Sequence, residues 1–71
     1  MDQIMIGRFI AAMRKEQGLT QRQLAEILDV SNRTISKWEC GDGLPDLSNV
    51  LPLCDALGIT ADELLHGERK K

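Results

Sequence analysis

The sequence predicts a small all-α domain, and three observations support this prediction. With 71 residues the chain is long enough for one domain. Residues typical of β-strands are scarce, since there is no Tyr, one Phe and one Trp, whereas Leu, Ala, Glu, Gln and Arg, which favour helices, are plentiful. Hydrophobic residues make up 42% of the chain and charged residues 28%, a composition that argues against intrinsic disorder.

Turn signals divide the chain into five helical segments joined by short connections. The predicted helices cover residues 4–16, 21–28, 32–39, 47–57 and 61–66. Gly18 and Gly58 follow the first and fourth segments, as glycine commonly does at the C-terminal end of a helix. In the first four segments, apolar residues recur at helical spacing, which predicts one buried face per helix. The residues predicted to face inward are Ile6, Phe9, Ile10 and Met13, then Leu24, Ile27 and Leu28, then Ile35 and Trp38, and finally Leu47, Val50, Leu51, Leu53, Cys54 and Leu57.

Three of these helices begin with the same local pattern. Thr20, Ser31 and Thr60 each stand just before a predicted helix, with one apolar residue before the hydroxyl and another four positions after it. The hydroxyl can accept a backbone N–H that has no partner inside the helix, and the apolar pair fixes the entering chain. Gln23 and Glu63 can reach back to complete a capping box. The pattern therefore predicts defined starts for three helices that are marginal on their own.

Several classes of function find no support in the sequence. No apolar run approaches the roughly 18 residues of a membrane span, and Arg8 interrupts the apolar N-terminal stretch without a cleavage site after it, so we expect no secretory signal. Cys40 and Cys54 fit no metal spacing and are expected to be thiols in a reducing cytoplasm. His66 has no partner at ligand spacing. With no nucleophile–base pair and no phosphate-binding glycine loop, we expect no enzyme and no cofactor.

The charge of the chain is unevenly distributed. The net charge of −2 is unfavourable for binding nucleic acid. Residues 1–39, however, carry six basic and five acidic side chains, a net of +1, whereas residues 40–71 carry three basic and six acidic side chains, a net of −3. Because only the face that meets the phosphates matters, the net charge does not exclude a DNA-binding protein.

The segment 32–39 carries the most informative pattern. Ile35 and Trp38 share one side of the helical wheel. The opposite arc is formed entirely by hydrogen-bonding side chains, namely Asn32, Ser36, Arg33 and Lys37. Such a face suits a helix in the DNA major groove, where Arg and Lys match guanine and Asn matches adenine. Any small surface helix also has a polar outer face, so this pattern alone leaves both interpretations open.

The surrounding sequence favours the DNA-binding interpretation. The stretch GLTQRQLAEILDVSNRTISKWECG closely resembles the helix-turn-helix of phage-repressor-like regulators, the XRE or Cro/repressor family. The matching features include Thr20 and Gln21 opening one helix, Leu24 and Ala25 packing inward, and a Ser before the next helix. The resemblance extends over about residues 4–66. It implies a five-helix bundle of the lambda-repressor-like type over residues 1–66, with the motif at about 20–40 and residues 67–71 as a solvated tail or the start of a linker.

The resemblance also implies roles for individual residues. Asn32, Arg33 and Lys37 would face base edges, Gln21 would meet a phosphate at the start of its helix, and Thr34 would hydrogen-bond the DNA backbone. Arg14 and Glu39 stand where family members have an intramolecular ion pair, which makes Arg14 a structural residue. The less certain candidates for DNA contact are Arg22, Ser36, Ser48 and Asn49.

The chain departs from the family pattern at two places. Asp29 stands where the family usually has Gly, in a turn position that tends to be left-handed, a conformation that Asp tolerates better than most residues. The loop after the third helix is basic in some relatives but carries Asp42 and Asp46 here, so we expect phosphate contacts from the backbone N–H groups of Ser48 and Asn49 instead.

The function implied by the resemblance is sequence-specific binding of double-stranded DNA by a bacterial or phage transcriptional regulator, acting as a repressor or activator on the nucleoid in the cytoplasm. One such domain reads a half-site, so a homodimer on a pseudo-palindromic operator is expected. The alternative is an antitoxin-type protein-interaction module on the same fold. Residues 40–71, with Leu64 and Leu65 expected to be exposed, would then bind a toxin or an effector domain, and no membrane partner is expected.

Overall fold

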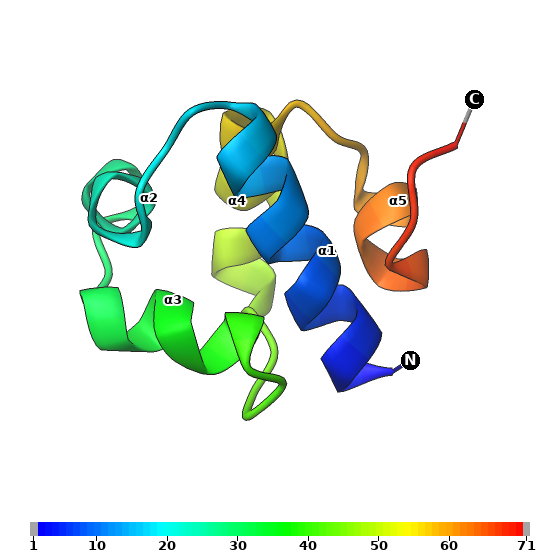
Figure 1. Cartoon of the computed structure of the whole chain (residues 1–71), viewed down its shortest axis with the longest axis horizontal. Helices are drawn as coiled ribbons and strands as arrows, with labels where there is room; N and C mark the ends of the chain where they lie inside the picture. The colour runs from blue at the N-terminus through cyan, green and yellow to red at the C-terminus, as the bar shows by residue number, and fades with distance from the viewer. Residues whose placement is uncertain (1, 71) are drawn as a thin grey trace.

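The computed structural model describes residues 2–70 and consists of five α-helices around one core (Figure 1). The helices are α1 (Gln3–Glu16), α2 (Gln21–Leu28), α3 (Asn32–Glu39), α4 (Leu47–Leu57) and α5 (Ala61–His66). No strand occurs within the described range. The predicted all-α architecture is confirmed, and every predicted helix boundary lies within one residue of the observed one.

The helix α1 is the centre of the bundle. It packs against α3, α4 and α5, whereas α2 packs against α3 and α4 (Figure 1). The fully buried side chains come from four helices and are Ile10, Leu24, Ile35, Leu53 and Leu57. Burial of one such side chain stabilises a fold by about 1.5–3 kcal/mol. Helices of 14 residues or fewer are thus held mainly by this shared core.

The three predicted hydroxyl caps are present. The Oγ1 atoms of Thr20 and Thr60 each accept a backbone N–H at 3.0 Å, and the Ser31 Oγ accepts the Thr34 N–H at 3.1 Å. The reciprocal bonds of both capping boxes also form, because Gln23 accepts the Thr20 N–H at 2.8 Å and Glu63 accepts the Thr60 N–H at 2.9 Å. The capping residues therefore determine where α2, α3 and α5 begin.

The chain after α5 is attached to the bundle. Residues 68–70 are exposed, and Lys71 lies outside the described residues. The Arg69 guanidinium donates to Glu16 at 2.7 Å, and the side chain of Lys70 pairs with Asp62. The Lys70 N–H donates to the second carboxylate oxygen of the buried Glu63 at 2.8 Å. Hydrogen bonds from the Thr60 and Lys70 backbones hold the pKa of Glu63 below its usual range.

Four side-chain positions differ from the prediction. Ile27, Leu47 and Leu51 were expected inside but are 57%, 89% and 69% exposed. On the helical wheel, the buried side of α2 is centred between Leu24 and Ala25, and Ile27 points more than about 100° away from that direction. The buried side of α4 is centred between Leu53 and Cys54, and Leu51 points away from it by a similar angle. Leu47 is the first residue of α4. Conversely, Leu64 was expected to be exposed but is 2% exposed, because α5 packs it into the core beside α1 and α4.

The turn between α2 and α3 contains a left-handed residue that is not glycine. Asp29 has φ 56° and ψ 45° and ends α2. Its N–H donates to the Glu26 carbonyl at 3.3 Å, and the next N–H, of Val30, donates to the Ala25 carbonyl at 3.0 Å. The expected left-handed turn is therefore present with Asp in place of Gly, and these two bonds satisfy carbonyls at the end of the helix.

Both cysteines are free thiols, Cys40 exposed and Cys54 buried, and burial raises the pKa of the Cys54 thiol.

No helix between Gln3 and His66 combines the length and the apolar character needed to cross a bilayer. Within residues 2–70, no three His, Cys, Asp or Glu side chains gather as they would around a metal ion.

Candidate nucleic-acid interface

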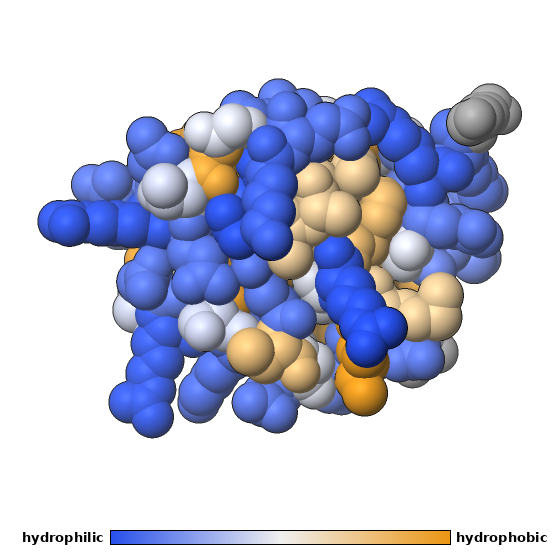
Figure 2. Space-filling model, in the orientation of Figure 1, coloured by the Kyte–Doolittle hydropathy of each residue, from blue (hydrophilic) through white to orange (hydrophobic). Residues whose placement is uncertain are grey.

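The helix α3 presents a polar face to solvent. Ile35 and Trp38 are buried against the rest of the bundle, as predicted. Asn32, Arg33 and Lys37 are exposed on the other side of the helix. Figure 2 shows a hydrophilic surface at the lower left, where α3 lies, whereas apolar surface gathers along α1. The three residues that the resemblance assigns to base edges are thus all accessible from outside.

The remaining candidates on α3 are more constrained. Thr34 and Ser36 are half-buried. The Thr34 hydroxyl lies 2.9 Å from the Ser31 Oγ, and the Thr34 N–H also bonds to Ser31. This arrangement fixes the Thr34 side chain at the start of α3, where backbone N–H groups point outward and favour an anion.

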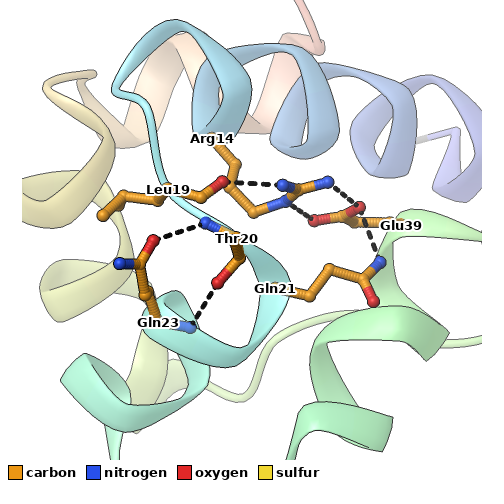
Figure 3. Close-up of polar contacts among 6 residues, drawn as sticks. All are labelled: Arg14, Leu19, Thr20, Gln21, Gln23 and Glu39. Carbon is orange, nitrogen blue, oxygen red and sulfur yellow. Dashed lines mark hydrogen bonds and ion pairs between the residues drawn. The ribbon is translucent and has the colours of Figure 1, made fainter.

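The start of α2 is tied to the end of α3 by a network of polar side chains (Figure 3). Arg14 of α1 donates from Nε to Glu39 Oε2 at 2.7 Å and from Nη2 to Glu39 Oε1 at 3.1 Å. Its Nη1 donates to the Leu19 carbonyl at 2.7 Å, just before α2. The side chains of Arg14 and Glu39 are only 11% and 7% exposed. The pair implied by the resemblance is therefore present, and it links α1, the connection before α2 and the end of α3.

Gln21 takes part in the same network. Its Nε2 donates to Glu39 Oε1 at 3.0 Å, and the side chain is half-buried (Figure 3). The neighbouring Arg22 is exposed. Sequence reasoning missed the bond between Gln21 and Glu39, because the two residues are 18 positions apart and no spacing pattern signals their contact.

The start of α4 offers fewer donors than expected. Ser48 is exposed and Asn49 is half-buried. The Asn49 N–H, however, already donates to the Asp46 carbonyl at 2.9 Å. Asp42 and Asp46 are exposed in the preceding loop, and the Asp46 carboxylate makes no capping bond. The cations that accompany the polar face of α3 are thus Arg22, Arg33 and Lys37.

A compact five-helix bundle with a short, exposed polar helix after a tight turn defines a helix-turn-helix domain. The Helix-turn-helix family model (HTH_3) matches residues 10–64, and the chain belongs to this family. The resemblance to phage-repressor-like regulators is thereby confirmed.

Similar proteins include two regulators and one solved repressor structure. The HTH-type transcriptional activator BcrR of Enterococcus faecalis is 46% identical over 56 residues, which cover 79% of this chain and 28% of that protein. The cryptic phage CTXphi transcriptional repressor RstR of Vibrio cholerae is 40% identical over 55 residues, which cover 78% of this chain and 49% of that protein. The chain thus spans less than half the length of these two relatives.

The solved structure is that of the c2 repressor of Salmonella phage P22 in complex with a synthetic operator. It matches with a TM-score of 0.84 at 38% identity, covering 89% of this chain and 96% of that one. The predicted fold type, a bundle like the DNA-binding domains of phage repressors, is therefore confirmed.

Proposed function

We propose that this chain is the sequence-specific DNA-binding domain of a bacterial or phage transcriptional regulator, and that it acts by binding rather than by catalysis. The observation that carries the proposal is the outer face of α3, where Asn32, Arg33 and Lys37 are exposed while Ile35 and Trp38 anchor the helix. In this mechanism α3 enters the major groove and α2 lies across the sugar–phosphate backbone. The fold shared with an operator-bound repressor supports this docking.

The exposed side chains of α3 would read bases. Arg33 and Lys37 can donate to guanine O6 and N7, and the amide of Asn32 can pair with adenine N6 and N7. None of the three forms a side-chain hydrogen bond within residues 2–70 that would have to break first. Gln21, Arg22 and Thr34 would instead meet phosphates, contacts that position the protein without reading sequence.

The first prediction separates base contacts from fold. Arg33→Ala and Lys37→Ala should leave the melting temperature nearly unchanged, because both side chains project into solvent. Each should weaken operator binding by about 1–3 kcal/mol, roughly five- to 150-fold. Thr34→Ala should weaken operator and scrambled duplexes alike. The measurement is titration of both duplexes, after selection of the operator from random DNA, at several salt concentrations.

The matched control is Arg69→Ala, which removes the same charge from the chain end beside Glu16 and should leave operator binding intact. With three cations near the motif, the affinity should fall with salt at a slope of about −0.9 per neutralised phosphate, for about two to four phosphates per protomer. If Arg33→Ala and Lys37→Ala both bind the operator as well as the unchanged protein, α3 does not read the DNA.

We also propose that the domain binds a pseudo-palindromic operator as a homodimer. The supporting observation is exposed apolar surface on α1 and α5, where Ile4, Met5 and Leu65 are 55%, 49% and 48% exposed. Beside Leu65 lies an apolar cleft of about 60 Å³ lined by Ile6, Leu44, Pro45, Val50, Leu64 and Leu65. A patch that holds both protruding side chains and a hollow can pair with itself across a two-fold axis.

The second prediction concerns the proposed homodimer. Sedimentation should show a monomer–dimer equilibrium at micromolar concentrations, and Leu65→Ser should shift it towards the monomer because it removes apolar contact area. A strict monomer, even on operator DNA, would contradict this proposal. The antitoxin alternative loses support because Leu64, one of the two leucines expected to be exposed on its partner surface, is buried, and the relatives described above are transcriptional regulators.

A further inference from the structure

We infer that Glu39, held by Arg14, positions the side chain of Gln21 for contact with a DNA phosphate. The ion pair would then serve DNA binding as well as folding, with Arg14 and Glu39 as positioning residues that do not touch DNA themselves. This inference rests on the proposed function, because it requires a phosphate at the start of α2.

The first step is the geometry of the shared carboxylate oxygen. Glu39 Oε1 accepts from Arg14 Nη2 at 3.1 Å and from Gln21 Nε2 at 3.0 Å (Figure 3). Glu39 Oε2 accepts from Arg14 Nε at 2.7 Å, so both carboxylate oxygens are held by one guanidinium. A planar, two-pronged pairing of this kind orients the carboxylate rigidly. The acceptor for Gln21 is thus fixed before any DNA arrives.

The second step is the orientation of the Gln21 amide. An ionised carboxylate only accepts hydrogen bonds, so the end of the amide that faces Glu39 must be the NH₂ group. That nitrogen carries two hydrogens, one of which is donated to Glu39. A phosphate also only accepts, and the second hydrogen is the group that it requires. The bond to Glu39 therefore leaves the amide in the orientation that a phosphate can use, and it orders the side chain in advance.

The third step is charge. A carboxylate close to a DNA phosphate would repel it. Glu39 is hydrogen-bonded to Gln21, the residue that is proposed to contact the phosphate. The Arg14 guanidinium balances that charge at two bonds, one for each carboxylate oxygen. The Arg14–Glu39 pair thus orders the long Gln21 side chain before binding and also removes this repulsion. Together, these two effects should raise the affinity for DNA by about two- to tenfold.

The test compares Gln21→Ala in two backgrounds. One is the unchanged protein, and the other is the double variant Arg14→Met and Glu39→Met, which replaces the buried pair by apolar side chains of similar length and leaves the net charge unaltered. Such replacements are often tolerated by the fold. Gln21→Ala should weaken binding to operator and scrambled DNA by about tenfold in the unchanged protein, and by about twofold or less without the pair.

The matched control is Thr34→Ala, since Thr34 is fixed by Ser31 rather than by Glu39. Its effect on binding should be the same in both backgrounds. The order of the Gln21 side chain can also be measured directly in the unchanged protein without DNA, by nitrogen-15 relaxation of its NH₂ group. In the free protein this group should have an order parameter close to the value of about 0.85 typical of rigid backbone.

The inference is overturned if Gln21→Ala weakens binding equally in both backgrounds, or if the Gln21 NH₂ group is mobile in the free protein. It is also overturned if Gln21→Ala has no effect in the unchanged protein while Arg33→Ala impairs operator binding, an outcome that leaves the proposed function intact. If Arg33→Ala and Lys37→Ala are silent as well, the proposed function itself fails.

Discussion

Arg14→Ala is expected to lower the free energy of unfolding by about 3–5 kcal/mol. The change would leave the Glu39 carboxylate buried without its cation and the Leu19 carbonyl without its donor. Proteins of this kind are stabilised by only about 5–15 kcal/mol in total, and small domains stand at the low end. Urea denaturation followed by circular dichroism would measure the loss.

Related variants make this prediction specific. Glu39→Ala should destabilise for the converse reason, because it leaves a buried guanidinium, and the two alanines together should cost no more than the sum of the single changes. Arg14→Lys keeps the charge but loses the planar fork, so it should restore only part of the stability. If either single alanine variant melts at the temperature of the unchanged protein, the pair does not stabilise the fold.

Gly7→Ala is expected to destabilise the protein by about 2–3 kcal/mol, although alanine favours helices over glycine by about 1 kcal/mol. The residue lies in the middle of α1, where that helix crosses the end of α3. A Cβ atom at this position would collide with the Trp38 carbonyl oxygen and lie 2.8 Å from that of Glu39. Backbone atoms cannot rotate away, so α1 and α3 would have to separate.

The control for this variant is Gly43→Ala. Gly43 lies in the loop before α4, and a Cβ atom there would meet nothing within 4 Å. Its melting temperature should match that of the unchanged protein, whereas that of Gly7→Ala should fall by several degrees. An unaltered melting temperature for Gly7→Ala would mean that the two helices are not in close contact at this point.

The helix boundaries could be predicted from the sequence because their signals are local. Thr20, Ser31 and Thr60 bond to backbone groups three residues away, and glycines end α4 and α5. The outward face of α3 could also be predicted, because Ile35 and Trp38 are the only large apolar residues in that helix. In each case the residues that determine the structure lie within one or two helical turns of each other.

Features that depend on packing between helices could not be predicted in the same way. Leucine is frequent on both sides of α4, so the pattern alone did not show that Leu51 faces solvent while Leu53 is buried. The bond from Gln21 to Glu39 depends on how α2 and α3 are placed by the core. The close crossing at Gly7 has the same origin, since a glycine inside a helix does not by itself indicate a neighbouring backbone.

The carboxylate of Glu63 has a consequence for how the end of the chain opens. One oxygen accepts the N–H of Thr60, just before α5, and the other accepts the N–H of Lys70. The Glu63 side chain thus links the two ends of the segment 60–70. A six-residue helix is too short to persist alone. We therefore expect residues 60–70 to open as one cooperative unit rather than to fray from the end. Because its pKa is lowered in the folded state, Glu63 stabilises this unit at neutral pH, and the contribution disappears as the pH falls through that lowered value.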